Sequence, residues 1–210
     1  MATFLVVDDH ELMRSAVRHL LLALRPGSTI EEAGTADLAQ QAVERARVDL
    51  VVLDLGLEGR SGLDLLAELN RKWPEQRVLV LSGYSEDSWA RRALASGARG
   101  YVAKSAAADE LRGAVSHVLE GGRYVSAALA EGLAADLGSG VVRTPLELLS
   151  ARELEVLRQV AKGASLKETA AVLHLSQKTV ETYRARIAAK LGLSSNVALT
   201  RFALRNGIID

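Results

Sequence analysis

The sequence predicts an α/β fold in which a doubly wound, five-stranded parallel sheet is followed by a small all-α domain of four helices. Through the first 120 residues, short apolar runs alternate with segments of helical periodicity, which is typical of parallel strands covered on both faces. After residue 150 no strand-like run occurs, and short helical segments follow one another with joints of two to four residues. The change of pattern indicates two domains.

The first domain is expected to span residues 1–120 and the second 147–210. Strands are expected at the apolar runs 4–7, 29–30, 50–53, 78–81 and 101–103, of which the second is weak. Helices are expected between them near 11–24, 36–46, 62–72, 86–96 and 107–120. Residues 121–146 contain five of the 17 glycines and are interpreted as a linker with a candidate short helix over about 126–137. The later helices are expected at 151–162, 165–173, 176–191 and 194–206.

Composition excludes several classes of protein. With 49% hydrophobic and 25% charged residues, the chain has the balance of a globular protein rather than a disordered one. No apolar run reaches the roughly 18 residues of a membrane span, and the N-terminus meets carboxylates too early for a signal peptide. The chain has no cysteine, which excludes disulfides and thiol catalysis. We therefore expect a cytoplasmic protein that does not enter membranes.

The net charge of zero conceals an asymmetry along the chain. Residues 1–120 carry 14 basic and 18 acidic residues, a charge of −4. Residues 150–210 carry 10 basic and 5 acidic residues, a charge of +5. A basic second domain is compatible with nucleic-acid binding, although charge alone does not distinguish that role from an ordinary basic surface.

Polar side chains follow four of the predicted strands at the point where each strand ends. Asp8 and Asp9 follow the first, Asp54 the third, Ser82 ends the fourth and Lys104 follows the fifth. Each could separately be a helix cap or a turn residue, but their joint placement at one sheet edge favours a common site. Clustered carboxylates need a cation, and oxygen ligands suit Mg²⁺. Asp54 could then act as a nucleophile that forms an aspartyl phosphate.

The segments FLVVDDH, DLVVLDLGLEGRSGLDLL, VLVLSGYS and GARGYVAKS resemble the receiver domain of two-component response regulators, with its flavodoxin- or CheY-like fold, over about residues 2–120. The resemblance implies that Asp54 is the phosphoacceptor. It implies that the Mg²⁺ ligands are Asp8 (mostly through water), Asp9, Asp54 and the carbonyl of Gly56. It implies that the switch and phosphoryl-binding residues are Ser82, Gly83, Tyr101 and Lys104, with Tyr101 turning inward as Ser82 moves.

The loop after Asp54 departs from the family pattern. Leu57 and Glu58 stand where the family usually has Met-Pro. Gly56 offers no side chain to shield a phosphoryl group, so we expect its hydrolysis not to be strongly hindered. Haloacid-dehalogenase-like phosphatases are a competing interpretation, but they need a second carboxylate at the position of Gly56, which disfavours them.

The segment from Ser176 to Leu191 has the pattern of an amphipathic helix. Val180, Tyr183 and Ile187 lie on one face together with Leu191, which predicts a core face. The opposite stripe is small and polar with basic edges, which suits entry into a DNA major groove; a solvated surface helix is the alternative. The preceding helix and a tight turn at His174 complete a helix-turn-helix pattern.

The stretch that begins LSARELEVL and continues through SQKTVETYRARIAAKLG resembles the LuxR-type DNA-binding domain over about residues 147–208. With the receiver, it makes the chain similar to the NarL/FixJ subfamily of response regulators. The resemblance implies base contacts from Lys178, Glu181, Thr182 and Ala185, and phosphate contacts from Thr179, Arg184 and Arg186. It also implies that the helix near 194–206 pairs two such domains.

Together these features predict a response regulator transcription factor. A sensor histidine kinase would phosphorylate Asp54 with Mg²⁺ bound, and the chain would then bind promoter DNA as a homodimer. RNA polymerase is a further candidate partner. Catalysis would be limited to self-phosphotransfer and autodephosphorylation. The alternative is a phosphorylation-independent regulator whose receiver serves for dimerisation or docking.

Overall fold

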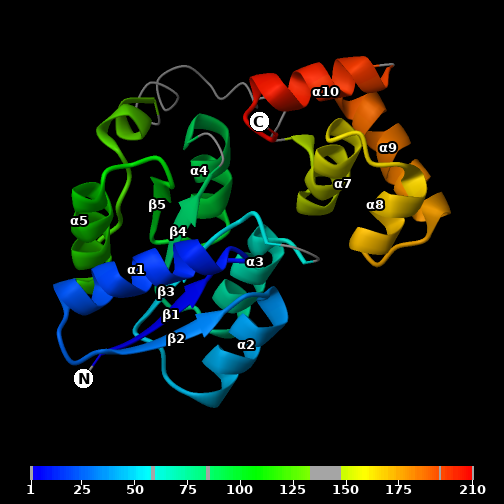
Figure 1. Cartoon of the computed structure of the whole chain (residues 1–210). Coiled ribbons are helices and arrows are strands. Elements are labelled where there is room, and N and C mark those ends of the chain that lie inside the picture. Colours follow the sequence, from blue (N-terminus) through cyan, green and yellow to red (C-terminus); the bar gives the residue numbers. More distant parts are fainter. Residues whose placement is uncertain (1, 58–59, 84–85, 133–147, 194, 210) are drawn as a thin grey trace. The chain divides into compact units, whose positions relative to one another are not determined.

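The computed structural model describes residues 2–57, 60–83, 86–132, 148–193 and 195–209. The chain forms two compact units, Met1–Gly138 and Ser139–Asp210 (Figure 1). In the part of the chain that the structure describes, no helix is long and apolar enough to cross a membrane.

The first unit is built on five parallel strands in the order β2-β1-β3-β4-β5, which confirms the predicted fold class. The strands are β1 (Thr3–Val7), β2 (Thr29–Ala33), β3 (Leu50–Leu53), β4 (Val78–Ser82) and β5 (Gly100–Ala103). The helices are α1 (Glu11–Leu24), α2 (Ala36–Arg45), α3 (Gly62–Lys72), α4 (Glu86–Ala95) and α5 (Ala108–Leu119). Helices α1 and α5 cover one face of the sheet, and α2, α3 and α4 the other (Figure 1).

The central strands are buried on both faces, which explains their continuous apolar sequences. Every residue of β3 and β4 is buried, and the face under α1 and α5 holds a core that includes Phe4, Leu50 and Val115. Strand β2 is longer than its apolar run because Glu31 and Glu32 pair along β1 at the edge of the sheet. Charged residues are typical of an edge strand, so the sequence underestimates its length.

The chain after α5 returns to the sheet. Tyr124 makes an isolated parallel bridge with Gly100: its N–H donates to the Arg99 carbonyl at 2.9 Å, and its carbonyl accepts from the Tyr101 N–H at 3.2 Å. A Cβ on Gly100 would lie 2.8 Å from the Tyr124 oxygen, so glycine permits this approach. Residues 127–132 are helical, while the rest of the candidate helix over 126–137 lies outside the described residues. The first residues after α5 therefore extend the edge of the sheet.

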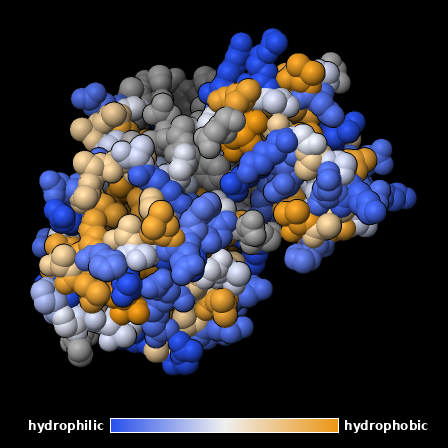
Figure 2. All heavy atoms as spheres, in the orientation of Figure 1, coloured by the Kyte–Doolittle hydropathy of each residue, from blue (hydrophilic) through white to orange (hydrophobic). Residues whose placement is uncertain are grey.

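The second unit contains α7 (Ala151–Ala161), α8 (Leu166–Val172), α9 (Gln177–Leu191) and α10 (Asn196–Arg205), as the helical periodicity predicts. A serine caps each helix by accepting a hydrogen bond from the first turn: Ser150, Ser165, Ser176 and Ser195. Helix α7 packs against α8, α9 and α10, and α8 packs against α9. On the face shown in Figure 2, apolar side chains of the unit are scattered among hydrophilic ones.

Candidate functional sites

Asp8, Asp54 and Lys104 meet at the carboxyl edge of the sheet. Both carboxyl side chains belong to residues that are only 4% exposed. The Lys104 Nζ lies 2.7 Å from an oxygen of Asp54 and 2.7 Å from an oxygen of Asp8. Parallel pairing carries each residue just past the end of its strand: the Asp54 N–H donates to the Val7 carbonyl at 2.8 Å. The ends of β1, β3 and β5 thus place one ammonium between two carboxylates.

The pKa of Lys104 reflects two opposed effects. Burial lowers the pKa, but the negative charges and hydrogen bonds of Asp54 and Asp8 raise it by more than burial lowers it. The pKa of Lys104 therefore lies above its ordinary value. Lys104 is therefore an ammonium at neutral pH. A cation held this close to Asp54 can also meet the oxygens of an anion bound to that carboxylate.

Asp9, His10 and Arg14 extend this cluster from the start of α1. The His10 Nδ1 lies 2.5 Å from an Asp9 oxygen, and the His10 N–H donates to an Asp8 oxygen at 2.9 Å. Arg14 donates to the Asp8 carbonyl at 2.7 Å. Sequence reasoning missed His10, which precedes α1, and Arg14 in its first turn, although their spacing of four was available as a signal.

The donor set fits a divalent cation. Asp8, Asp9, His10 and Asp54 each offer a ligand atom, and these atoms lie within 4.8 Å of one another. The second oxygen of Asp54, Oδ1, is buried and has no hydrogen-bond partner among the described residues. A buried carboxylate oxygen without a partner destabilises the folded state unless a bound ligand interacts with it. Carboxylate oxygens at this spacing are suited to a hard ion with oxygen preference.

The residues expected to respond to phosphorylation lie in the strands that flank this cluster. Ser82, at the end of β4, and Tyr101, in β5, are both fully buried, so Tyr101 already points inward. Gly83 follows Ser82 at an exposed position, and a Cβ there would meet nothing within 4 Å. Gly56 lies in the loop after Asp54 and is half-buried. Glu58 lies outside the described residues.

The loop between β3 and α3 folds back on the Asp54 backbone. The Ser61 hydroxyl accepts from the Leu63 N–H and begins α3, and the Gly62 N–H donates to the Leu55 carbonyl at 3.3 Å. A Cβ on Gly62 would lie 2.4 Å from the Asp54 carbonyl oxygen, closer than any real contact. Gly62 is thus a requirement of the site that sequence reasoning did not identify.

Helix α9 presents the predicted polar residues to solvent. Val180 and Ile187 are buried, whereas the predicted core residues Tyr183 and Leu191 are half-buried. The exposed predicted contacts are Lys178, Glu181, Thr182, Ala185 and Arg186, and the half-buried ones are Thr179 and Arg184. The helix therefore carries one apolar face toward the unit and one accessible polar face.

Several contacts in α9 restrict the side chains on that face. The Thr182 hydroxyl donates to the Lys178 carbonyl at 2.9 Å, and the Thr179 hydroxyl lies 2.7 Å from that of Ser176. The Arg186 guanidinium lies 6.0 Å from the centre of the Tyr183 ring, within cation–π range. Lys178, with no such restraint among the described contacts, is free to reach outward.

The turn between α8 and α9 is held from α7. Arg152 donates to the carbonyl of Leu173 at the end of α8, and His174 adopts the left-handed φ of 52° that the tight turn requires. Buried Glu153 accepts from the Lys190 ammonium at 2.7 Å. Burial raises the pKa of Glu153, but its hydrogen bonds to Lys190 and Ser150 lower it more. These contacts fix the angle between the two helices.

Comparisons with known proteins agree with this architecture. Residues 4–116 match the response regulator receiver domain, and residues 147–203 match the bacterial regulatory proteins of the luxR family. The chain is 31% identical over its full length to the response regulator UvrY of Escherichia coli (strain K12), of which it covers 97%. It is 34% identical over its full length to the response regulator GacA of Pseudomonas viridiflava, of which it covers 99%.

A solved structure shares the fold of the chain. RcsB from Salmonella enterica serovar Typhimurium, bound to promoter rprA in the presence of the phosphomimetic BeF3−, matches with a TM-score of 0.70 and 24% identity. The match covers 96% of this chain and 97% of that one. The likeness concerns the fold.

An acidic cluster beside a lysine at the edge of a doubly wound sheet, joined to a helix-turn-helix unit, defines a signalling regulator with a receiver and a DNA-binding domain. The chain belongs to the two-component response regulators of the NarL/FixJ type, whose receiver is followed by a LuxR-type DNA-binding domain.

Proposed function

We propose that Asp54 accepts a phosphoryl group from a sensor histidine kinase, and that the phosphorylated chain binds promoter DNA as a homodimer in the cytoplasm. The observation that supports this best is the position of Asp54: one oxygen contacts Lys104 at 2.7 Å, and the other is buried with no hydrogen-bond partner in the part of the chain that the structure describes. A phosphoryl group on Asp54 would lie beside the ammonium of Lys104. Asp8, Asp9, Asp54 and the Gly56 carbonyl would hold Mg²⁺.

The transfer needs little covalent chemistry from the protein. The Asp54 carboxylate attacks phosphorus, a P–O bond forms as the P–N bond to the donor histidine breaks, and the released imidazole takes a proton from solvent. Bound Mg²⁺ supplies neutralisation of the phosphoryl charge. Lys104 moves its hydrogen bond from Asp54 to a phosphoryl oxygen, and Ser82 and the amides of Gly56 and Gly83 donate to the others. Self-phosphotransfer and autodephosphorylation are the only catalytic steps in this proposal.

The added charge of roughly −1.5 to −2 is the signal that reaches the second domain. Ser82 and Tyr101 adjust to the new group, and the dimeric form is favoured by a population shift. Helix α9 then enters the major groove in each half-site, with α10 pairing the two domains. RcsB, which shares the fold, binds promoter rprA in the presence of the phosphomimetic BeF3−, which agrees with DNA binding by a phosphorylated form. RNA polymerase is a candidate partner at the promoter.

The first test is phosphate incorporation at Asp54. With acetyl phosphate and Mg²⁺, the wild-type chain should acquire acid-labile phosphate and gain about tenfold in affinity for operator DNA, within the usual range of coupling energies. Asp54→Asn should acquire no label and show no gain. Asp109→Asn, which removes an exposed carboxylate from α5, is the matched control and should behave as wild type. Equal DNA affinity with and without acetyl phosphate would instead support the phosphorylation-independent regulator.

The second test separates base contacts from phosphate contacts. Lys178→Ala and Thr182→Ala should change the preferred sequence and cost about 1–3 kcal/mol on the best operator. Arg186→Ala should weaken all sequences alike and reduce the salt slope of log K by about 1. Arg112→Ala on α5 of the receiver is the control. A sequence preference that survives both α9 base-contact variants would exclude α9 as the helix that selects the operator.

A further inference from the structure

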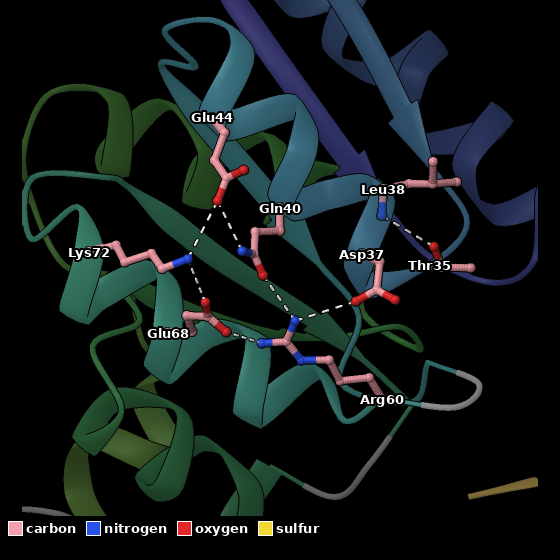
Figure 3. Close-up of polar contacts among 8 residues, drawn as sticks. All are labelled: Thr35, Asp37, Leu38, Gln40, Glu44, Arg60, Glu68 and Lys72. Carbon is pink, nitrogen blue, oxygen red and sulfur yellow. Dashed lines mark hydrogen bonds and ion pairs between the residues drawn. The ribbon is translucent and has the colours of Figure 1, made fainter. Parts of the chain in front are cut away.

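Arg60 ties the loop after the phosphoacceptor to two helices of the receiver (Figure 3). It stands six residues after Asp54, and its side chain points toward residues of α2 and α3. One guanidinium nitrogen donates to the Gln40 amide oxygen at 3.0 Å and lies 3.5 Å from Asp37, both on α2. The other donates to Glu68 on α3. A single side chain thus joins three segments.

The contacts of Arg60 continue into a closed ring. Glu68 binds the Lys72 ammonium at 2.7 Å, Lys72 lies 3.4 Å from Glu44, and Gln40 donates to the same Glu44 oxygen at 2.9 Å (Figure 3). Hydrogen bonds from Lys72 and Arg60 lower the pKa of Glu68, and the hydrogen bond to Glu68 raises that of Lys72. Glu68 and Lys72 therefore stay charged at neutral pH.

Arg60 differs from the other members of the ring in what holds its backbone. Gln40, Glu44, Glu68 and Lys72 lie within helices, whose hydrogen bonds and apolar contacts persist without the ring. Arg60 lies in the loop, between Gly56 and the point where Gly62 closes on Leu55. Loss of its guanidinium would release the segment from Arg60 to Gly62 that closes on Leu55, whereas loss of Lys72 would only weaken the contact of two helices.

The strength of the Arg60 contacts depends on how far the charged side chains are exposed to solvent. The side chain of Arg60 is 31% exposed and that of Glu68 is 23% exposed, so neither charge is fully in solvent. An isolated surface ion pair stabilises a protein only weakly, but Arg60 adds contacts with Gln40 and Asp37 on α2 to its ion pair with Glu68 on α3. The loss of these contacts would be small compared with the free energy of global unfolding, but large compared with the free energy of opening one loop.

We propose that Arg60 is a positioning residue for the phosphoacceptor site: it anchors the segment that leads into Gly62, whose N–H donates to the Leu55 carbonyl, and so keeps the neighbouring Gly56 carbonyl in the place where Mg²⁺ binding needs it. The inference rests on the proposed function, because it assigns Gly56 to the metal. Arg60 itself contacts neither metal nor phosphoryl group in this role. It acts through the loop.

The test compares Arg60→Ala, Arg60→Lys and the control Lys72→Ala in the full-length chain. Amide hydrogen exchange of a peptide containing Leu55 to Leu63 is measured without metal, and Mg²⁺ affinity is measured by titration calorimetry. Arg60→Ala should speed exchange about tenfold and weaken Mg²⁺ binding about tenfold, at the low end of losses seen when supporting contacts of a metal site are removed. Arg60→Lys should recover part of both, because an ammonium can bind Glu68 without the fork. Lys72→Ala should match wild type within about twofold.

The outcomes separate this inference from the function on which it rests. If wild type binds no Mg²⁺, the proposed metal site fails, and the positioning role fails with it. If wild type binds Mg²⁺ and Arg60→Ala binds it equally well, only the positioning role is overturned. Equal losses in Arg60→Ala and Lys72→Ala would overturn it too, because the ring would then act through the helices. Urea midpoints of all variants confirm that each is folded.

Discussion

Replacing Gly62 with alanine should destabilise the receiver by about 3 kcal/mol, the upper part of the range for overpacked sites. The new Cβ would lie 2.4 Å from the Asp54 carbonyl oxygen and 2.6 Å from the Leu55 Cα. Both obstacles are backbone atoms, which cannot rotate aside as a side chain can. The backbone of the phosphoacceptor must therefore move, and phosphate incorporation from acetyl phosphate should fall at least tenfold. Calorimetry of the full chain, followed at the receiver transition, measures the first effect.

Gly113→Ala is the matched control for Gly62→Ala. Gly113 lies in the middle of α5, and a Cβ there would meet nothing within 4 Å. Alanine is favoured over glycine inside a helix by roughly 0.5–1 kcal/mol, so this variant should be slightly more stable than wild type. If Gly62→Ala were as stable as Gly113→Ala and accepted phosphate at the normal rate, the close packing of the loop on Asp54 would be disproved.

Lys104→Met should destabilise the metal-free receiver by about 2–3 kcal/mol at pH 7. Removal of one partner from a buried ion pair costs about 3–5 kcal/mol because a charge is left unpaired, and the residual 18% exposure of the Lys104 side chain reduces this figure. Two nearly buried carboxylates, Asp8 and Asp54, would then face one another without a cation. Urea unfolding of both proteins without divalent ions measures the difference.

The effect of Lys104→Met should depend on pH and on Mg²⁺. The folded pKa of Lys104 lies above its unfolded value of 10.5, so its contribution is complete below pH 10.5 and is lost as pH rises through the folded pKa. The difference in unfolding free energy between wild type and Lys104→Met should therefore be constant near neutrality and should disappear at strongly alkaline pH. Saturating Mg²⁺ should stabilise Lys104→Met more than wild type, because the ion replaces the missing positive charge. Lys167→Met, at an exposed position on α8, should show neither dependence. A Mg²⁺ response equal in Lys104→Met and wild type would contradict this account.

The residues at the strand ends could be predicted because their placement follows from topology alone. Parallel strands end at one edge, so Asp8, Asp54 and Lys104 had to lie near one another once the strands were identified. The apolar face of α9 was similarly predictable from its period. The edge strand β2 was predicted only in part, because its residues Glu31 and Glu32 are charged and do not continue the apolar run.

Other features depended on contacts between distant segments. Tyr124 lies in a glycine-rich stretch that indicates a linker, yet its backbone pairs with β5, and no local pattern announces such pairing. Gly62 resembles an ordinary helix-start glycine until the Asp54 carbonyl is placed beside it. From the sequence alone, Arg60 is indistinguishable from an ordinary surface charge, because its contact with Gln40 on α2 depends on the tertiary structure.

The order of apolar and polar residues along this chain was sufficient to determine its two domains, its sheet and the chemical types gathered at each site, because periodicity and strand ends are local properties. Tertiary structure alone decided which atoms meet: the ammonium between two carboxylates, the glycine pressed against the phosphoacceptor backbone, and the arginine that closes a ring across two helices. Those contacts join residues up to 96 positions apart, as Lys104 and Asp8 are, and their separation of a few ångströms is set by packing of the whole domain rather than by any neighbouring sequence.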